Sequence, residues 1–308
     1  MQKIYQTTLS DYINFEGIGL HSGKKSKIKV LPGAVDQGIV FKRTDIKENN
    51  LIKANYKNVS SAKLCTTLKN KHGVKVSTVE HLLAALYIAE IDNAIVEIDN
   101  EEIPIMDGSA RDFLNAIKKI EIKTLPKKRK YLKVIDKFEL IDGERKISIE
   151  PCDLSFEVDF QLNYKNEIIG DQRNVVNFQT DSLEDISNSR TFCLFEDIEK
   201  IKKIGLAKGG SLDNAIVVDN NKVMNEKGLR NKKEFVNHKI LDLAGDFLLS
   251  GFRIFGKVKC YQGGHELTNM FLRKLLLSQS FLTSMELAEA EISKKIDSTQ
   301  SIKLAVNC

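Results

Sequence analysis

Residues 234–246 read Glu-Phe-Val-Asn-His-Lys-Ile-Leu-Asp-Leu-Ala-Gly-Asp, and apolar residues recur in and just beyond this stretch at the spacing of a helix. His238, Asp242 and Asp246 follow one another at intervals of four residues, which places them on one face of that helix. A neutral imidazole and a carboxylate oxygen are ligands that suit zinc. His238 and Asp242 are therefore candidate metal ligands, although this pattern alone also fits a solvated polar face.

The composition is that of a soluble globular protein, and the length of 308 residues suggests about two domains. The 47 basic and 42 acidic residues are interspersed, and the formal net charge is only +5. A nucleic-acid-binding protein more often gathers its basic residues on one surface and interleaves them with aromatic residues. We therefore expect no nucleic-acid partner.

Cysteine usage and hydropathy bear on the cellular compartment. The five cysteines are scattered and never form Cys-x-x-Cys, which argues against a disulfide framework and fits a reducing cytoplasm. The N-terminus has no apolar core of a signal peptide, and no apolar run is long enough to span a bilayer. The sequence thus predicts a cytoplasmic protein with no transmembrane segment, and we expect it to be a monomer.

Two halves of the chain, 1–126 and 131–308, share an order of predicted elements. In each half, strands come first and are followed by a helix, a strand, a glycine-containing loop and a second helix. The basic segment 126–130 between them is predicted to be a solvated linker. The expected fold class is α+β, with two similar domains whose sheets each pack against helices and whose helix layers face each other across an active site.

A third metal ligand is predicted in the first domain. Ser77-Thr-Val-Glu80 has the form of a capping box and opens an apolar helix with His81 in its first turn. If the helix layers face each other, His81 can meet His238 and Asp242 across the interface. Glu80 could then deprotonate a metal-bound water. A competing interpretation makes Glu80 a helix cap that accepts a hydrogen bond from the Ser77 backbone N–H.

One glycine-rich bend carries a histidine outside these helices. The segment 17–23 lacks the strand and helix that flank a dinucleotide-binding loop, so His21 is interpreted as a structural turn residue.

Taken together, the motifs resemble those of the UDP-3-O-acyl-N-acetylglucosamine deacetylases of lipid A biosynthesis. The matching stretches occur in order from near the start of the chain to about residue 280. They are Gly-Ile-Gly-Leu-His-Ser-Gly (17–23), Ser-Thr-Val-Glu-His-Leu (77–82), Ile-Pro-Ile-Met-Asp-Gly-Ser (103–109), Ser-Arg-Thr-Phe (189–192), Gly-Gly-Ser-Leu-Asp-Asn-Ala-Ile-Val-Val-Asp (209–219), Val-Asn-His-Lys-Ile-Leu-Asp-Leu-Ala-Gly-Asp (236–246) and Gly-His-Glu-Leu-Thr-Asn (264–269).

This resemblance implies zinc-dependent hydrolysis of the N-acetyl group of a UDP-sugar that bears a 3-O-acyl chain, with release of acetate. It implies zinc bound by His81, His238 and Asp242. It also implies Glu80 as the general base that activates the zinc-bound water.

Further roles follow from the same resemblance. His265 would protonate the leaving amine, Asp246 would hold His265, and Thr191 would help to stabilise the oxyanion. A carboxylate partner would keep the imidazolium of His265 available at a helix N-terminus, where the helix dipole favours its neutral form.

The substrate contacts that the resemblance implies lie around the second domain. Lys239 would meet the diphosphate, Phe160 and Phe192 would line the nucleotide end, and the segment 196–222 would form an apolar passage for the acyl chain.

The sequence departs from the family pattern at two places. Cys193 and Leu194 stand where the family usually has Gly-Phe, and Gln262 stands near the diphosphate where the family often has a basic residue. Both departures concern substrate contacts and neither concerns the metal ligands.

Two other functions fit the zinc pattern: an amidase that acts on another amide, and a binding protein with structural zinc. Candidate acids and bases beside three ligands favour catalysis, because a structural site normally closes with a fourth protein ligand.

Overall fold

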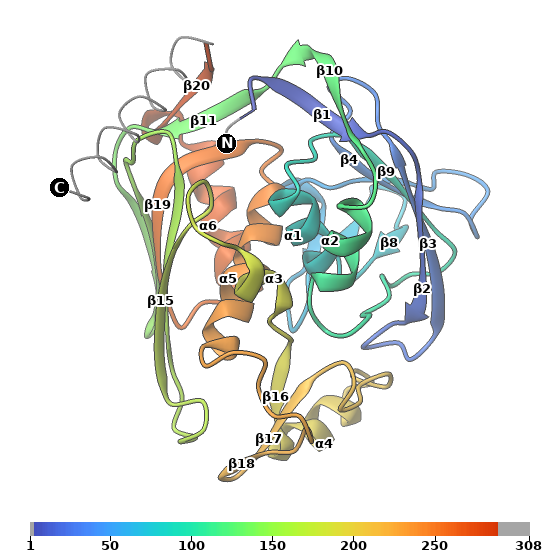
Figure 1. Cartoon of the computed structure of the whole chain (residues 1–308), viewed down its shortest axis with the longest axis vertical. Helices are drawn as coiled ribbons and strands as arrows, with labels where there is room; N and C mark the ends of the chain where they lie inside the picture. The colour runs from blue at the N-terminus through green and yellow to red at the C-terminus, as the bar shows by residue number, and fades with distance from the viewer. Residues whose placement is uncertain (1–2, 289–308) are drawn as a thin grey trace, which may run out of the picture.

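The computed structural model describes residues 3–288, and two layers of helix lie between two β-sheets (Figure 1). The helices α1 (Glu80–Ile88) and α2 (Arg111–Ile117) pack against the sheet of the first domain. The helices α5 (Glu234–Leu248) and α6 (His265–Leu277) pack against the sheet of the second domain. The predicted α+β fold class, with its facing helix layers, is confirmed.

The sheet of the first domain contains five strands. Buried and exposed residues alternate along its strands, because successive side chains point to opposite faces of a sheet. In β3, for example, Ile28 and Val30 are buried whereas Lys27 and Lys25 are exposed. The strand order is β2 (Ile13–Ile18), β3 (Lys25–Pro32), β9 (Ala94–Ile98), β4 (Ile39–Arg43) and β5 (Leu51–Lys53).

A smaller sheet and a short helix complete the first domain. The sheet is formed by β6 (Val59–Ser61), β7 (Thr67–Lys69) and β8 (Lys75–Val76), and a 3₁₀-helix spans Tyr56–Asn58. The turn between β6 and β7 contacts the second domain, where the Thr66 hydroxyl donates a hydrogen bond to Asp246.

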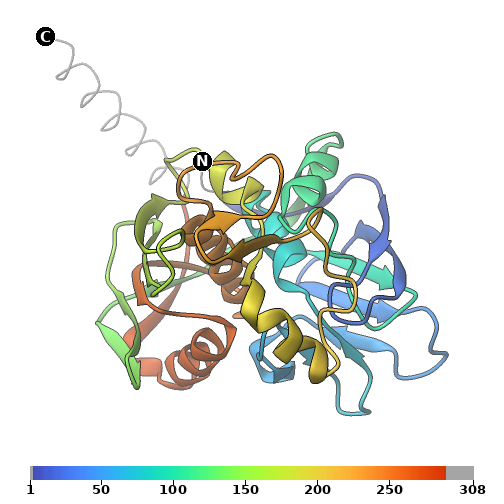
Figure 2. The ribbon, with the colours of Figure 1, turned by 90° about the horizontal axis from the view of Figure 1, so that it is seen from below.

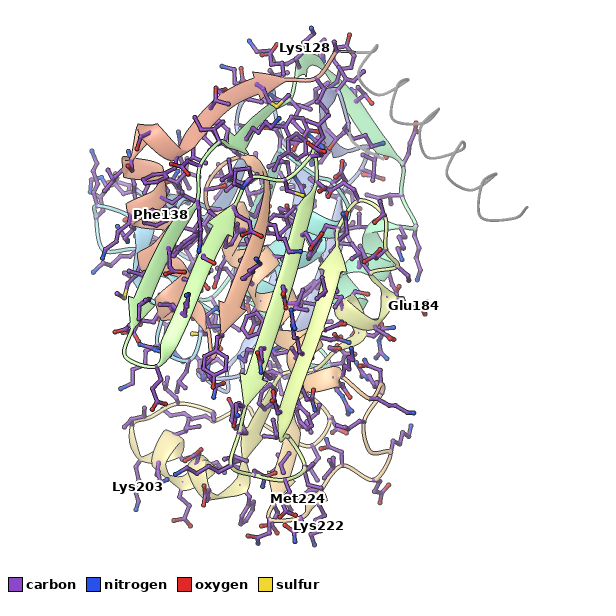
Figure 3. The ribbon with its side chains drawn as sticks, turned by 90° about the vertical axis from the view of Figure 1, so that its left-hand side faces the viewer. Lys128, Phe138, Glu184, Lys203, Lys222 and Met224 are labelled. Carbon is purple, nitrogen blue, oxygen red and sulfur yellow. The ribbon has the colours of Figure 1, made fainter. Side chains whose placement is uncertain are left out.

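The sheet of the second domain contains seven strands, and Figure 3 looks onto the face that points away from the helices. β19 runs through its middle and pairs with β11, β13 and β14. The strands are β11 (Lys130–Val134), β12 (Phe138–Asp142), β13 (Arg145–Glu150), β14 (Phe156–Asn163), β15 (Asp171–Asn177), β19 (Arg253–Tyr261) and β20 (Leu282–Glu286), and a 3₁₀-helix, Gln279–Phe281, precedes the last of them.

An insert projects from the second domain between β15 and α5 (Figures 1 and 2). The short helix α3 (Glu184–Asn188) leads into it. The insert itself contains β16 (Phe192–Leu194), α4 (Phe195–Lys203), β17 (Ile216–Asp219) and β18 (Lys222–Val223).

Helix α5 is buried along nearly its whole length because both domains cover it. Its closest neighbour across the interface is the first turn of α1. A Cβ atom added at Gly245 would lie 2.2 Å from the carbonyl oxygen of Glu80, so only glycine permits this approach. The contact brings Glu80 and His81 of the first domain to the polar face of α5.

The segment 126–130 is solvated as predicted, apart from Arg129, but it is not a linker outside the sheets. The segment continues β10 (Ile122–Lys128), which pairs with β1 (Tyr5–Leu9). Arg129 is only 2% exposed, and its guanidinium contacts Glu90 at 2.7 Å and Asp92 at 2.8 Å. Burial of this arginine is possible because carboxylates of the first domain neutralise it.

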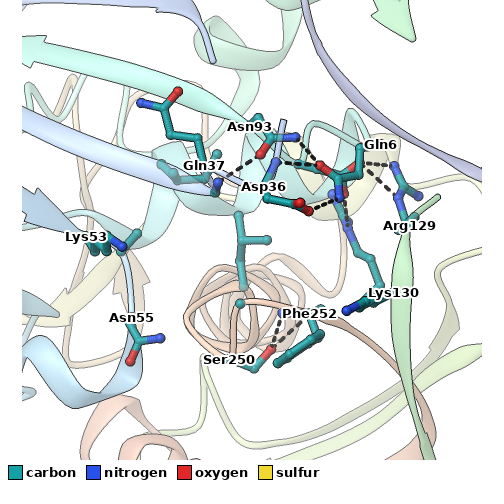
Figure 4. Close-up of a pocket in the computed structure, with 17 residues that line it drawn as sticks. Gln6, Asp36, Gln37, Lys53, Asn55, Asn93, Arg129, Lys130, Ser250 and Phe252 are labelled. Atoms are coloured by element: carbon teal, nitrogen blue, oxygen red, sulfur yellow. Dashed lines mark hydrogen bonds and ion pairs between the residues drawn. The ribbon is translucent and has the colours of Figure 1, made fainter. Parts of the chain in front are cut away.

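The same end of the interface contains a cavity of about 350 Å³, shown in Figure 4. Asp36, Arg129 and Ser250 are among the residues that line it. The cavity lies at the C-terminal end of α5, whereas the predicted ligands His238 and Asp242 lie in the first half and the middle of this helix. No helix within residues 3–288 is long and apolar enough to cross a membrane.

Candidate metal centre and active site

Three buried side chains form a group that can hold a metal ion. His81 comes from the first turn of α1, and His238 and Asp242 come from successive turns of α5. Their ligand atoms all lie within 4.8 Å of one another. The Nε2 atoms of His238 and His81 lie 3.3 Å and 3.5 Å from Asp242 Oδ1.

The spacing of these atoms fits zinc. Ligands at about 2.0–2.1 Å in a tetrahedron are about 3.4 Å from one another. Asp242 Oδ1 is buried and has no hydrogen-bond donor among residues 3–288. Since buried polar atoms are rarely left without a partner, this oxygen is suited to a cation.

Hydrogen bonding and burial prepare both α5 residues for this role. His238 Nδ1 lies 3.1 Å from the carbonyl oxygen of Ser189, which can hold the proton on Nδ1 and leave Nε2 free. Burial lowers the pKa of His238 to about 3, so the ring is neutral at pH 7. Burial would raise the pKa of Asp242, but His238, Lys239 and His265 together hold it well below its ordinary value.

Glu80 lies beside the metal-ligand group and is 3% exposed. Its Oε1 lies 3.7 Å from His265 Nε2, and its Oε2 accepts a hydrogen bond of 3.0 Å from the Thr66 backbone N–H. Burial is the main cause that raises the pKa of this carboxyl.

The interpretation of Glu80 as a helix cap is wrong. Helix α1 begins at Glu80 itself, and the Ser77 backbone N–H donates to the carbonyl oxygen of Glu101 at 2.9 Å. Ser77 forms a β-bridge with Glu102, which holds its backbone away from the helix. The capping geometry therefore does not compete for the Glu80 carboxylate.

His265 is the first residue of α6 and faces three carboxylates. Its Nδ1 lies 2.7 Å from Asp246 Oδ2, and its Nε2 lies 3.8 Å from Asp242 Oδ2. Burial would lower the pKa of His265, but Asp246, Asp242 and Glu80 outweigh it and raise the pKa to about 10. A protonated imidazole therefore stands beside Glu80 at neutral pH.

The other predicted site residues differ in how close they lie to this group. Lys239 Nζ donates to Asp242 Oδ2 at 3.1 Å and lies 5.4 Å from the centre of the Phe192 ring. The backbone N–H of Thr191, two residues beyond the Ser189 carbonyl, donates to the Gly108 carbonyl at 2.8 Å. Phe160 is 1% exposed and belongs to the hydrophobic core that runs through both domains.

An apolar cavity of about 310 Å³ runs between the insert and the glycine-rich bend 17–23. The bend and the insert are in close contact. A Cβ atom added at Gly209 would lie only 2.3 Å from the Gly19 carbonyl oxygen. The lining of the cavity is mostly apolar and includes Leu20, Leu64, Thr191, Phe192, Cys193, Phe195, Ile198, Ile201, Leu212 and Val217.

His21 is a buried member of the glycine-rich bend, and its interpretation as a turn residue stays a prediction. It is 8% exposed, it lines this apolar cavity, and its Nε2 has no hydrogen-bond partner among the described residues. The buried carboxylate of Glu102 accepts hydrogen bonds from the backbone N–H groups of His21 (2.8 Å) and Ser22 (2.7 Å). The glycine-rich motif could have indicated His21, but no pattern in the sequence singles out Glu102.

Gln262, one of the two departures from the family pattern, has a local structural role. Its Oε1 accepts a hydrogen bond of 3.1 Å from the Asn163 backbone N–H at the end of β14. The other departure is the pair Cys193 and Leu194, of which Cys193 lies in the wall of the apolar cavity.

Comparisons with known proteins show which family this chain is similar to. The family model for UDP-3-O-acyl N-acetylglycosamine deacetylase matches residues 6–277. The chain is 41% identical over 288 residues to the UDP-3-O-acyl-N-acetylglucosamine deacetylase of Geotalea uraniireducens, with 93% of each chain covered. It is 42% identical to the proteins of that name from Shewanella frigidimarina and Pasteurella multocida, over 90% of this chain and 91% of each relative.

Proposed function

We propose that this chain, which belongs to the UDP-3-O-acyl N-acetylglycosamine deacetylase family, is a zinc-dependent hydrolase. Its substrate would be UDP-3-O-acyl-N-acetylglucosamine, from which it removes the N-acetyl group as acetate in lipid A biosynthesis. One observation carries the proposal: three buried ligands, with an Asp242 Oδ1 that has no hydrogen-bond partner among residues 3–288, lie beside the carboxyl group of Glu80 and the imidazole of His265.

His81, His238 and Asp242 would hold the zinc ion. When bound, zinc supplies Lewis acidity, which lowers the pKa of water and polarises an amide carbonyl. Within residues 3–288 the group offers three ligands, whereas a structural zinc site normally has four. This ligand count supports a catalytic site with a position left for water or substrate.

Glu80 would take a proton from the attacking water. The pKa of Glu80 is raised by burial, but a dication held by the three ligands would favour the ionised form that a general base needs. The hydrogen bond from the Thr66 N–H holds Oε2 and leaves Oε1 toward His265 and the metal-ligand group.

His265 would give a proton to the leaving amine. Asp246 holds its Nδ1, so Nε2 is directed toward Glu80 and Asp242. A positioned acid or base of this kind contributes about 10²–10⁴-fold to the rate. Thr191 would donate to the oxyanion that forms on the acetyl carbonyl oxygen, a role supported by its place two residues beyond Ser189, whose carbonyl accepts from His238.

The apolar cavity would receive the 3-O-acyl chain, since its lining is mostly aliphatic and aromatic. Lys239 would bind the diphosphate, and Phe160 and Phe192 would lie toward the nucleotide. The nearness of Lys239 and Phe192, 5.4 Å from nitrogen to ring centre, supports a shared contact with substrate for these two residues.

Acetate release from the UDP-sugar, measured with and without a chelator, tests the proposed reaction. We expect turnover to disappear when the metal is removed and to return when one equivalent of zinc is added. Turnover that survives complete removal of the metal would exclude the zinc-dependent reaction. A zinc-loaded protein with no acetate release from this substrate would instead point to another amide.

Lys239→Ala separates two roles of this lysine. We expect kcat/KM for the UDP-sugar to fall about 10–100-fold, as loss of a charged contact does, and kcat/KM for a substrate without the diphosphate to fall much less. Because Lys239 also bonds to Asp242 Oδ2, zinc content is measured in the same preparation. Equal losses on both substrates would show that Lys239 acts through Asp242 and does not bind phosphate.

A further inference from the structure

Thr66 links the two domains beside the proposed acid and base. It lies in none of the sequence motifs described above, and the proposed reaction assigns it no role. It lies just before β7 and is 2% exposed. Its backbone N–H donates to Glu80 Oε2 at 3.0 Å. Its hydroxyl donates to Asp246 Oδ1 at 2.7 Å.

These contacts complete a ring of four residues. Asp246 Oδ2 lies 2.7 Å from His265 Nδ1, and His265 Nε2 lies 3.7 Å from Glu80 Oε1. Thr66 closes the ring because it bonds to the second oxygen of both carboxylates. A single residue of the first domain therefore fixes the orientation of Glu80 and, through Asp246, that of His265.

We propose that Thr66 is a positioning residue that holds the general base and the general acid at a fixed separation. This inference rests on the proposed function, since it assumes that Glu80 and His265 transfer protons in one reaction. Asp246 is held at Oδ2 by His265 and at Oδ1 by Thr66, so its carboxylate plane is fixed. Without the hydroxyl, Oδ1 of a residue only 3% exposed loses this donor, and the plane is free to turn.

The chemistry of threonine makes the two contacts separable. Thr66→Val keeps the size of the side chain and the backbone N–H, so only the bond to Asp246 is lost. Thr66→Ser keeps the hydroxyl. Thr8→Val is a matched control, because the Thr8 hydroxyl is also buried and bridges Asn93 and Gly33 by hydrogen bonds of 2.7 Å and 2.8 Å in the first domain.

Steady-state kinetics on the zinc-loaded full chain test the inference. We expect Thr66→Val to lower kcat about 10–100-fold, because a small misplacement of a catalytic group costs up to about 10²-fold, with KM and zinc content unchanged. Thr66→Ser should stay within a few-fold of wild type, and Thr8→Val should lower the melting temperature and leave kcat unchanged. An unchanged kcat in Thr66→Val would overturn the inference.

A double-mutant cycle with Asp246→Ala shows whether Thr66 acts through Asp246. Once Asp246 is absent, adding Thr66→Val should produce no further fall in kcat. The same lack of additivity is expected in the melting temperatures of the metal-free proteins, a readout that needs no activity. Fully additive effects would refute the inference, whereas an inactive wild-type enzyme would refute the proposed function and leave the metal-free cycle to test the contact.

Discussion

Glu80→Gln is expected to lower kcat about 10²–10⁴-fold, because an amide cannot take the proton that a general base removes from water. The substitution is nearly isosteric. The glutamine side-chain oxygen can still accept the hydrogen bond from the Thr66 N–H, so the first turn of α1 should keep its place. Zinc content and melting temperature should therefore remain close to those of wild type. Steady-state turnover at saturating substrate is the deciding measurement.

Glu101→Gln is a suitable control for that experiment. Glu101 is in the same domain, but its side chain is 33% exposed and pairs with Lys75 at 3.3 Å, so it should tolerate the change. If Glu80→Gln keeps its zinc and turns over within a few-fold of wild type, Glu80 is not the base. His265 is then the next candidate for that role.

Removal of a metal ligand should have the larger effect. Asp242→Ala is expected to lose bound zinc and to reduce acetate release to the background rate, because its Oδ1 faces both imidazoles at 3.3 Å and 3.5 Å. His81→Ala and His238→Ala should behave in the same way. Metal analysis of each purified variant, together with turnover at saturating substrate, checks the prediction.

His72→Ala provides the matched control, since His72 is exposed and lies outside the metal-ligand group. It should retain one zinc per chain and full turnover. A ligand variant that retains tightly bound zinc at the same stoichiometry would remove that residue from the ligand set.

The local pattern of the sequence predicts helix α5 and its polar face well. The helix is apolar over most of its surface because both domains cover it, and this makes its helical spacing easy to recognise. The four-residue intervals then place His238, Asp242 and Asp246 on one face. The facing helix layers are also predictable from the shared order of elements. The sequence did not reveal that 126–130 is a paired, partly buried segment, because the burial of Arg129 depends on Glu90 and Asp92.

Contacts distant in sequence explain what sequence reasoning missed at the site. Thr66 and Asp246 are 180 residues apart, and His21 and Glu102 are 81 residues apart. No short-range pattern predicts such pairs. The capping interpretation of Glu80 failed for a related reason: Ser77 has the right spacing, but pairing with the segment near Glu102 decides where its N–H points.

The division of the three proposed ligands between α1 and α5 would give a bound metal ion a thermodynamic role beside its chemical one. An ion held by His81 on one side and by His238 and Asp242 on the other ties together distant parts of the polypeptide, as a covalent cross-link would. Metal affinity and docking of the domains would then be linked functions. A change that loosens the approach at Gly245 would weaken metal binding, and free zinc above its dissociation constant would shift the unfolding equilibrium toward the native state. A titration curve for zinc and a melting curve therefore measure two aspects of one free energy.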